Sequence, residues 1–277
     1  MKHKNFGLML GAIGILIVAV VCGFFVYTKT ETADYVVETN AFFAPFEFYK
    51  DREIVGVDVE IINRVAEKMG KKIKISDVEF DVIIDNVEAG KIADAGAAGL
   101  TITPAREEKV NFSIPYYTSV QYIIYSKDEA IDLRDGHITW DMLAGKTVGT
   151  QTGSTGYLFA ADEIDAGVLM GTETKLKGFD SHQLAADAIA AHIINYAIAD
   201  ELAAKFIVSK NSNLLAAPLY YAGATVAEDF PAEESYAIAV NKDRGELLAA
   251  FNEVLTEMIG DGEIDRLILK YMGLTDE

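Results

Sequence analysis

Apolar and polar positions alternate with two different periods along most of the chain. A helical period of three to four residues runs through residues 58–70, with apolar side chains at Val59, Ile62, Val65 and Met69. Gly70 marks the end of this helix, and residues 73–75 then alternate as a strand. Residues 80–88 predict the next helix. Strands that alternate with helices indicate a wound α/β sheet, in which ligands bind beyond the carboxyl ends of the strands.

The alternation restarts in the second half of the sequence. Residues 116–125 are aromatic and β-branched, which predicts a strand that leaves a first lobe as a hinge. A short strand at 145–149 and a buried strand at 196–199 predict a second lobe, with an Ala-rich helix at 184–194 between them. Residues 237–240 predict the strand that returns to the first lobe. Two amphipathic helices separated by Gly262 end the chain.

The N-terminal segment differs from the rest because residues 6–27 form an apolar run that is long enough to span a bilayer. Lys2 and Lys4 precede it, which predicts an N-terminus inside and a main body outside the membrane. Two alternatives to an uncleaved anchor helix remain open. Cys22 could carry a lipid, or the segment could be a cleaved signal, although its apolar core is longer than the usual 7 to 15 residues.

Composition narrows the class of function. The 277 residues are 51% hydrophobic and 24% charged, as in a globular protein. A net charge of −19 argues against nucleic acid or an anionic membrane surface as a partner. Cys22 is the only cysteine, so the sequence allows no intrachain disulfide and no cysteine-based metal cluster. The four histidines lack metal-ligand spacing; His182 and His192 are interpreted as surface residues. We expect neither a metal nor a cofactor.

Residues 99–106 carry the first candidate for a binding site. Thr103 is a good N-cap and Pro104 suits the first helical position, but Arg106 places a cation where it opposes the helix dipole. A bound carboxylate would explain that arginine, since helix N–H groups and a guanidinium both bind anions. The alternative is a surface arginine paired with Glu107 or Glu108.

Two further segments point to ligand contacts. Residues 151–156 form a Gly/Ser/Thr cluster that opens a helix, a geometry that binds anions, although Ser154 could simply cap that helix. Asp200 stands at the carboxyl end of a central strand, where α/β proteins place ligand contacts. A plain helix cap is an equally open interpretation of Asp200. The cluster lacks the Gly-Lys-Ser/Thr ending of a phosphate-binding P-loop.

The sequence Ala-Gly-Leu-Thr-Ile-Thr-Pro-Ala-Arg at 98–106, followed by Val-Asn-Phe-Ser-Ile-Pro-Tyr-Tyr at 110–117, resembles the polar amino-acid-binding family of solute-binding proteins, family 3, which includes glutamine- and histidine-binding proteins. The resemblance covers residues 35–273. It implies a two-lobe α/β fold of the type II periplasmic-binding-protein kind with two hinge strands, after an N-terminal anchor helix. The implied domains are an anchor or signal and tether (1–33), lobe 1 (34–118 and 234–277) and lobe 2 (119–233).

The same resemblance implies a function and a set of contacts. A member would be extracytoplasmic, would bind a free amino acid between its lobes, would deliver it to the permease of an ABC importer, and would act as a monomer held at the bacterial plasma membrane. The implied ligand-binding residues are Arg106, Asp200, Thr101, Gly99, Thr155, Ser154, Phe43, Phe80 and Asn40. Arg106 would hold the α-carboxylate and Asp200 the α-ammonium. Asn40, in place of an acid, predicts a ligand with an uncharged, polar side chain.

Two alternatives from other classes stay open. The first is a dehydratase on the same two-lobe fold, similar to cyclohexadienyl dehydratases, with Glu47 or Glu234 as a cleft acid of raised pKa. The second is a membrane-tethered amino-acid sensor. No catalytic residue is predicted, and binding is the preferred function.

Overall fold

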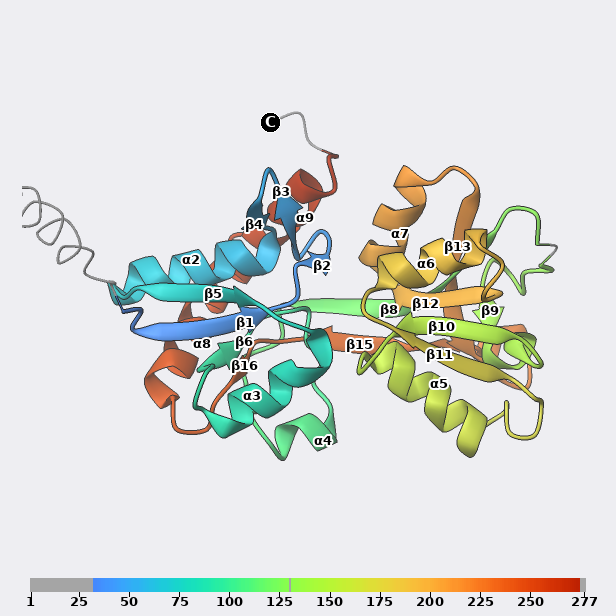
Figure 1. Cartoon of the computed structure of the whole chain (residues 1–277), viewed down its shortest axis with the longest axis horizontal. Coiled ribbons are helices and arrows are strands. Elements are labelled where there is room, and N and C mark those ends of the chain that lie inside the picture. Colours follow the sequence, from blue (N-terminus) through green and yellow to red (C-terminus); the bar gives the residue numbers. More distant parts are fainter. Residues whose placement is uncertain (1–31, 130, 275–277) are drawn as a thin grey trace, which may run out of the picture. The chain divides into compact units, whose positions relative to one another are not determined.

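Two β-sheets organise residues 32–129 and 131–274, the part of the chain that the computed structural model describes (Figure 1). In spatial order, the strands of the first sheet are β5 (Ile73–Asp77), β1 (Tyr35–Thr39), β6 (Ala95–Gly96), β16 (Ala239–Val240) and β7 (Asn111–Phe112). β1 runs parallel to β5 and β6, whereas β16 pairs antiparallel with β6 and β7. This sheet therefore combines segments from early and late in the sequence.

The second sheet is larger and is built from the middle of the chain. Its main path is β11 (Lys175–Phe179), β10 (Thr147–Gln151), β12 (Tyr196–Asp200), β8 (Tyr117–Ser126), β13 (Leu214–Tyr221) and β14 (Phe230–Pro231). β9 (Ile138–Thr139) pairs with β13, and β15 (Glu233–Tyr236) pairs with β8. A smaller three-stranded sheet contains β2 (Phe42–Phe43), β3 (Glu47–Lys50) and β4 (Glu53–Val55).

Strands β8 and β15 connect the two large sheets (Figure 1). The first half of β8 pairs antiparallel with β15, in the register Thr118 to Ser235 and Val120 to Glu233. From Gln121 onward β8 pairs instead with β12 and β13. Within residues 32–129 and 131–274, the chain passes between the two large sheets through these two strand segments, since β15 leads directly to β16 of the first sheet.

Helices lie on both faces of the first sheet. The helices of this region are α2 (Val57–Met69), α3 (Ile83–Ala89), α4 (Pro104–Glu107), α8 (Gly245–Gly260) and α9 (Glu263–Tyr271), with the 3-10 turn η1 (Phe80–Val82) before α3. Of these, α2, α3, α8 and α9 each bury an apolar stripe there, whereas the short α4 buries only Arg106. One core joins Val37, Ile61 and Phe251, and the core on the other face contains Ile83 and Val87. Gly70 ends α2 in the left-handed conformation, as the sequence predicts.

The second sheet is also packed on both faces. Its helices are α5 (Thr155–Asp165), α6 (His182–Ala190) and α7 (Glu201–Lys210), together with the 3-10 turns η2 (Trp140–Leu143) and η3 (Val226–Glu228). One core surrounds the buried Trp140 with Ile198 and Leu219, and the other packs the alanines of α6 against β12. The predicted wound α/β arrangement is therefore confirmed in both halves.

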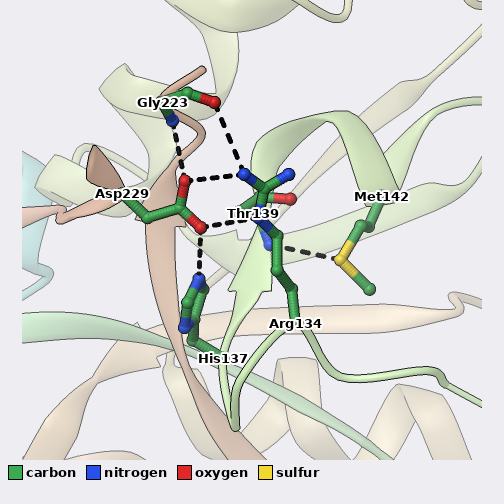
Figure 2. Close-up of polar contacts among 6 residues, drawn as sticks. All are labelled: Arg134, His137, Thr139, Met142, Gly223 and Asp229. Carbon is green, nitrogen blue, oxygen red and sulfur yellow. Dashed lines mark hydrogen bonds and ion pairs between the residues drawn. The ribbon is translucent and has the colours of Figure 1, made fainter. Parts of the chain in front are cut away.

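A buried carboxylate fixes one edge of the second sheet (Figure 2). Asp229, just after η3, receives a hydrogen bond from the Gly223 amide at 2.8 Å, forms an ion pair with Arg134 at 2.7 Å and is hydrogen-bonded to Nε2 of His137 at 2.8 Å. The His137 ring stacks on Tyr220 with centroids 4.3 Å apart. These contacts hold the β13–β14 connection against the segment that carries β9.

The predicted membrane segment, residues 6–27 with Cys22, lies outside the described residues. Among residues 32–129 and 131–274, no helix combines the length and the apolar character needed to cross a bilayer.

Candidate functional site

A small cavity lies where the carboxyl ends of strands from both sheets meet helix starts. Its walls are made by Phe43, Phe80, Ala98, Gly99, Thr101, Gln151, Ser154, Thr155, His182 and Asp200. Gln151 and Asp200 are the last residues of β10 and β12, and Thr155 and His182 begin α5 and α6. The cavity has about 10 Å³ of space accessible to water, about enough for one water molecule. Seven of the nine predicted site residues therefore line one enclosed space.

Arg106, the eighth predicted residue, is buried next to this cavity in α4. Its two terminal nitrogens donate hydrogen bonds to the carbonyls of Thr101, at 2.8 Å, and Gly153, at 3.1 Å. The guanidinium carbon lies 5.7 Å from the centre of the Phe80 ring. A surface pair with Glu107 or Glu108 is therefore wrong as an interpretation of Arg106. Its guanidinium instead bridges a loop after the first sheet and the turn before α5.

Thr103 caps α4 as predicted, because its hydroxyl accepts a hydrogen bond from the Arg106 amide at 3.3 Å. Ser154 caps α5 in the same way, accepting from the Tyr157 amide at 3.2 Å. The alternative of a helix cap for Ser154 is thus confirmed, and its hydroxyl also faces Thr150.

Thr101 and Thr155 place two hydroxyls on one carboxyl group. Thr101 donates to Oε2 of Glu234 at 2.6 Å, and Thr155 donates to the same oxygen in a short contact. The two hydroxyl oxygens are themselves 3.4 Å apart. Glu234 comes from β15, so these contacts join a loop of the first sheet, a helix of the second and a connecting strand. Burial, and the neighbouring Asp200, raise the pKa of Glu234 well above its usual range.

Asp200 turns its carboxyl group into the site rather than onto α7. It occupies the N-cap position of α7, but its side chain makes no capping hydrogen bond. One oxygen accepts from the Tyr236 hydroxyl at 2.5 Å, and the other accepts from Nε2 of Gln121 in a short contact. The interpretation of Asp200 as a plain helix cap is therefore wrong. Burial raises its pKa, and hydrogen bonds and the Arg106 charge oppose that shift.

Asn40, the ninth predicted residue, reaches the cavity through Gln151. Its side-chain oxygen accepts from Nε2 of Gln151 at 2.9 Å, and its side-chain nitrogen donates to the Val78 carbonyl at 2.8 Å. Gln151 also donates to the Asp180 carbonyl at 3.0 Å. The amide pair thus crosses between the two sheets with most of its hydrogen-bonding capacity in use.

Aromatic rings close another side of the cavity. Phe43 lies 5.6 Å from the His182 ring and 5.6 Å from the Phe46 ring, between centroids. His182 is buried rather than on the surface, and burial lowers its pKa to about 4. Its imidazole is therefore neutral at pH 7, so this wall carries no positive charge.

Gly99 is held by a third buried acid, Asp58. Its backbone is in the left-handed region, with φ 55°, and its amide donates to Oδ2 of Asp58 at 3.0 Å. The other Asp58 oxygen accepts from the Tyr116 hydroxyl at 2.6 Å. Burial raises the pKa of Asp58 to about 6, and burial together with Asp58 raises the pKa of Glu47 well above its usual range. Asp58 therefore ties the Gly99 turn to the residue that precedes β8.

Sequence reasoning missed Gln121, Gln151 and His182 as parts of the site. Gln121 lies inside a strand whose alternation predicts only a hinge. Gln151 opens the Gly/Ser/Thr cluster at 151–156 but is not among the predicted contacts, and its place just after the predicted strand at 145–149 is the signal that could have found it. His182 was assigned to the surface because it precedes an Ala-rich helix. Glu234 was singled out only as the acid of an enzyme.

Comparisons with known proteins identify the family. The model of the family described as bacterial extracellular solute-binding proteins, family 3, matches residues 35–274. The arginine-binding extracellular protein ArtP of Bacillus subtilis is 32% identical over 240 residues, which is 85% of each chain. The lysine/arginine/ornithine-binding periplasmic protein of Escherichia coli is 29% identical and covers 84% of this chain and 85% of its own.

Solved structures show the same similarity. A mutant of the arginine-binding protein ArgBP from T. maritima superimposes with a TM-score of 0.73 and 31% identity, over 86% of this chain and 95% of that one. An ancestral arginine-binding protein bound to arginine gives a TM-score of 0.71 and 30% identity, over 86% and 97% of the two chains.

Proposed function

The chain belongs to the family of bacterial extracellular solute-binding proteins, family 3, and we propose that it captures a free amino acid at the cavity beside Arg106 and Asp200 and delivers it to an ABC importer. The observation that carries this proposal is the burial of one guanidinium and one carboxylate, from opposite sides, next to one small cavity. An α-amino acid presents the two complementary charges. The matching relatives are named for amino-acid binding, which supports the same role.

In the proposed complex, Arg106 takes the α-carboxylate and Asp200 the α-ammonium. The hydroxyls of Thr101 and Thr155 and the Gly99 turn would complete the contacts to these two groups. The Thr101 carbonyl holds one terminal nitrogen of Arg106 within its own lobe, and the bond from the other nitrogen to the Gly153 carbonyl is made across the two lobes. Such preorganised charges bind with less loss of conformational entropy than mobile ones.

We further propose that lobe 1 (34–118 and 234–277) and lobe 2 (119–233) move apart about β8 and β15 to admit the ligand. Space for about one water molecule cannot hold an amino acid, so entry requires the walls to separate. The crossing strands are the only covalent links between the two large sheets within residues 34–129 and 131–274. Hinge closure of this kind is common in binding proteins. Small-angle scattering should show compaction on binding.

The N-terminal segment is proposed to hold the protein at the outer face of the plasma membrane, through residues 6–27 as a helix or through a lipid on Cys22. Replacement of Cys22 by Ala distinguishes the two routes. Release into the medium, or blocked maturation, would identify lipidation as the anchor.

We propose that the ligand has an uncharged, polar side chain. The wall of the cavity that would face this side chain carries the hydrogen-bonded amides of Asn40 and Gln151 rather than a carboxylate. The relatives' names point instead to cationic side chains, and an ancestral arginine-binding protein has been solved with arginine and with glutamine. Parallel titrations with L-arginine and L-glutamine decide between the two classes. Tighter binding of arginine would refute the uncharged class.

The test of the function is calorimetry of the full chain against the twenty protein amino acids. Asp200→Asn should weaken the tightest ligand by about tenfold to a hundredfold, since a charge-assisted hydrogen bond contributes about 1.5 to 3 kcal/mol. Asp243→Asn, at an exposed aspartate, is the matched control and should bind as the wild type does. Failure of all twenty amino acids to bind would refute the proposal.

A further inference from the structure

Two carboxyl groups meet beside the cavity, and a zwitterionic ligand requires only one of them. Asp200 lines the cavity, whereas Glu234 accepts hydrogen bonds from the lining residues Thr101 and Thr155. Asp200 ends β12 and Glu234 lies in β15, and both are buried. Nε2 of Gln121 donates to one oxygen of each, to Glu234 at 2.5 Å and to Asp200 in a short contact. A single amide nitrogen therefore holds the two acids side by side.

Charge counting shows that this pair cannot be fully ionised without cost. Arg106 is the cation beside it, and it is the group proposed to meet the ligand's own carboxylate. His182 is neutral at pH 7, as shown by its lowered pKa. Other titratable groups in the described part of the chain that interact with the pair are Tyr236, beside both acids, Tyr117, near Asp200, and Glu47, a further buried acid near Asp200 whose own pKa is raised by burial. Two buried carboxylates that share a site keep a proton between them.

The hydrogen bonds around the pair point the same way. Gln121, Thr101, Thr155 and Tyr236 all direct donors at the two acids. In the free protein, these four donors can stabilise one buried negative charge. A second negative charge requires a cation, and the ammonium group of the ligand would supply it. An ammonium group that enters beside Asp200 would therefore convert a carboxylic acid–carboxylate pair into two carboxylates around a cation.

We propose that Glu234 is a second acid of the ammonium subsite, which shares one proton with Asp200 until the ligand's ammonium group binds and displaces that proton into the solvent. This inference rests on the proposed function, because it assumes that Asp200 receives the α-ammonium. The inference adds Glu234 to the residues that take part in binding, and it adds one released proton to the products of the binding reaction. The subsite selects primary ammonium groups, since an acylated nitrogen or a hydroxyl carries no charge to replace the proton.

The sign of the pH dependence follows from the displaced proton. Where the free pair holds its proton, each bound ligand releases one, and the dissociation constant rises as the pH falls. The limiting slope is tenfold per pH unit for one proton. Above the pH at which the free pair loses its proton, nothing is displaced and the affinity is level.

Calorimetry of the full chain counts the protons when it is run at each pH in two buffers that differ in the heat of taking up a proton. Acetate and piperazine serve near pH 5, and phosphate and Tris serve near pH 7.5. The titrants are the twenty protein amino acids, and the tightest is carried forward. We expect the release of close to one proton per ligand at the acidic end. Glu234→Gln should still bind but should release no proton and lose the acid dependence of affinity. Glu233→Gln, at the exposed neighbour on the same strand, should behave as the wild type does.

The outcomes separate this inference from the proposed function. Binding without proton release by the wild-type chain, at every pH tested, overturns the shared proton and leaves the function intact. A Glu234→Gln variant that binds and still releases a proton assigns the proton elsewhere and also overturns the inference. Absence of binding by any amino acid overturns both. If Glu234→Gln does not fold, the proton count of the wild type alone decides.

Discussion

The pH dependence of the free energy of unfolding should show how much the buried, ionised carboxylate of Asp58 destabilises the fold. Asp58 accepts hydrogen bonds from the Gly99 amide and the Tyr116 hydroxyl, yet burial raises its pKa from 3.8 to about 6. The folded chain therefore holds a proton on Asp58 over a pH range in which the unfolded chain has lost it. The contribution of Asp58 to stability is greatest below about pH 4 and declines as the pH rises to about 6.

The size of that decline follows from the shift. One pKa unit corresponds to about 1.4 kcal/mol, so a shift of about two units corresponds to about 3 kcal/mol between acidic and neutral pH. Asparagine at this position does not ionise and has nearly the same shape. Asp58→Asn should therefore gain about 3 kcal/mol relative to the wild type between about pH 4 and pH 7.5, on top of a constant offset from altered hydrogen bonding.

Urea denaturation of both chains across this pH range measures the difference directly, because the other titrating groups contribute to both chains. Glu47 is the exception, because Asp58 raises its pKa and the two acids therefore titrate together. A double-mutant cycle of Glu47→Gln and Asp58→Asn measures the interaction between them. Asp243→Asn, an exposed change of the same kind, should show no pH-dependent difference. A constant difference between Asp58→Asn and the wild type would refute the account of Asp58 as a costly buried charge.

Three further changes test other parts of the structure. Arg106→Lys should weaken amino-acid binding at least about tenfold in calorimetry, because an ammonium cannot reproduce the fork that contacts the carbonyls of Thr101 and Gly153; an effect within twofold would contradict this. Gly99→Ala should lower stability by about 1 to 3 kcal/mol in urea denaturation, since φ is 55° and the new Cβ would lie 2.5 Å from the Phe43 ring; unchanged stability would show that the turn relaxes. Asp229→Asn should lower the melting temperature more at pH 7 than at pH 3. Hydrogen bonds and Arg134 outweigh desolvation and lower the pKa of Asp229, so the stability that its carboxylate contributes is lost as the pH falls through that pKa. An equal loss at both pH values would argue against the ion pair with Arg134.

The wound α/β fold could be predicted because its signals are local. The stripe of α2, its end at Gly70 and the cap at Thr103 are each specified by neighbours in sequence, and the structure has all three. The burial of Arg106 was also signalled locally, since a cation in the first turn of a helix calls for a partner. The lobe boundaries stay a prediction.

The second acid and the glutamines of the site could not be found in the same way. Gln121 and Glu234 meet because β8 and β15 pair antiparallel, and Asp200 joins them because β12 pairs with β8 and places Asp200 opposite Gln121. No short-range pattern encodes that pairing. Asp58 was also hidden, because an acid in the first turn of a helix is ordinary on the grounds of the dipole alone, while its burial depends on Tyr116, 58 residues away.

Arg106 is held by backbone carbonyls rather than by side chains, and this affects how ligand preference can change among related sequences. Because the guanidinium is held by the carbonyl oxygens of Thr101 and Gly153, substitutions of most side chains in these turns leave its anchoring unchanged. Asn40, Gln151 and His182, by contrast, present side chains to the cavity's other walls or support them. If Arg106 binds the α-carboxylate as proposed, mutation can change the walls that face the ligand's side chain while the contact to the carboxylate common to all amino acids is kept.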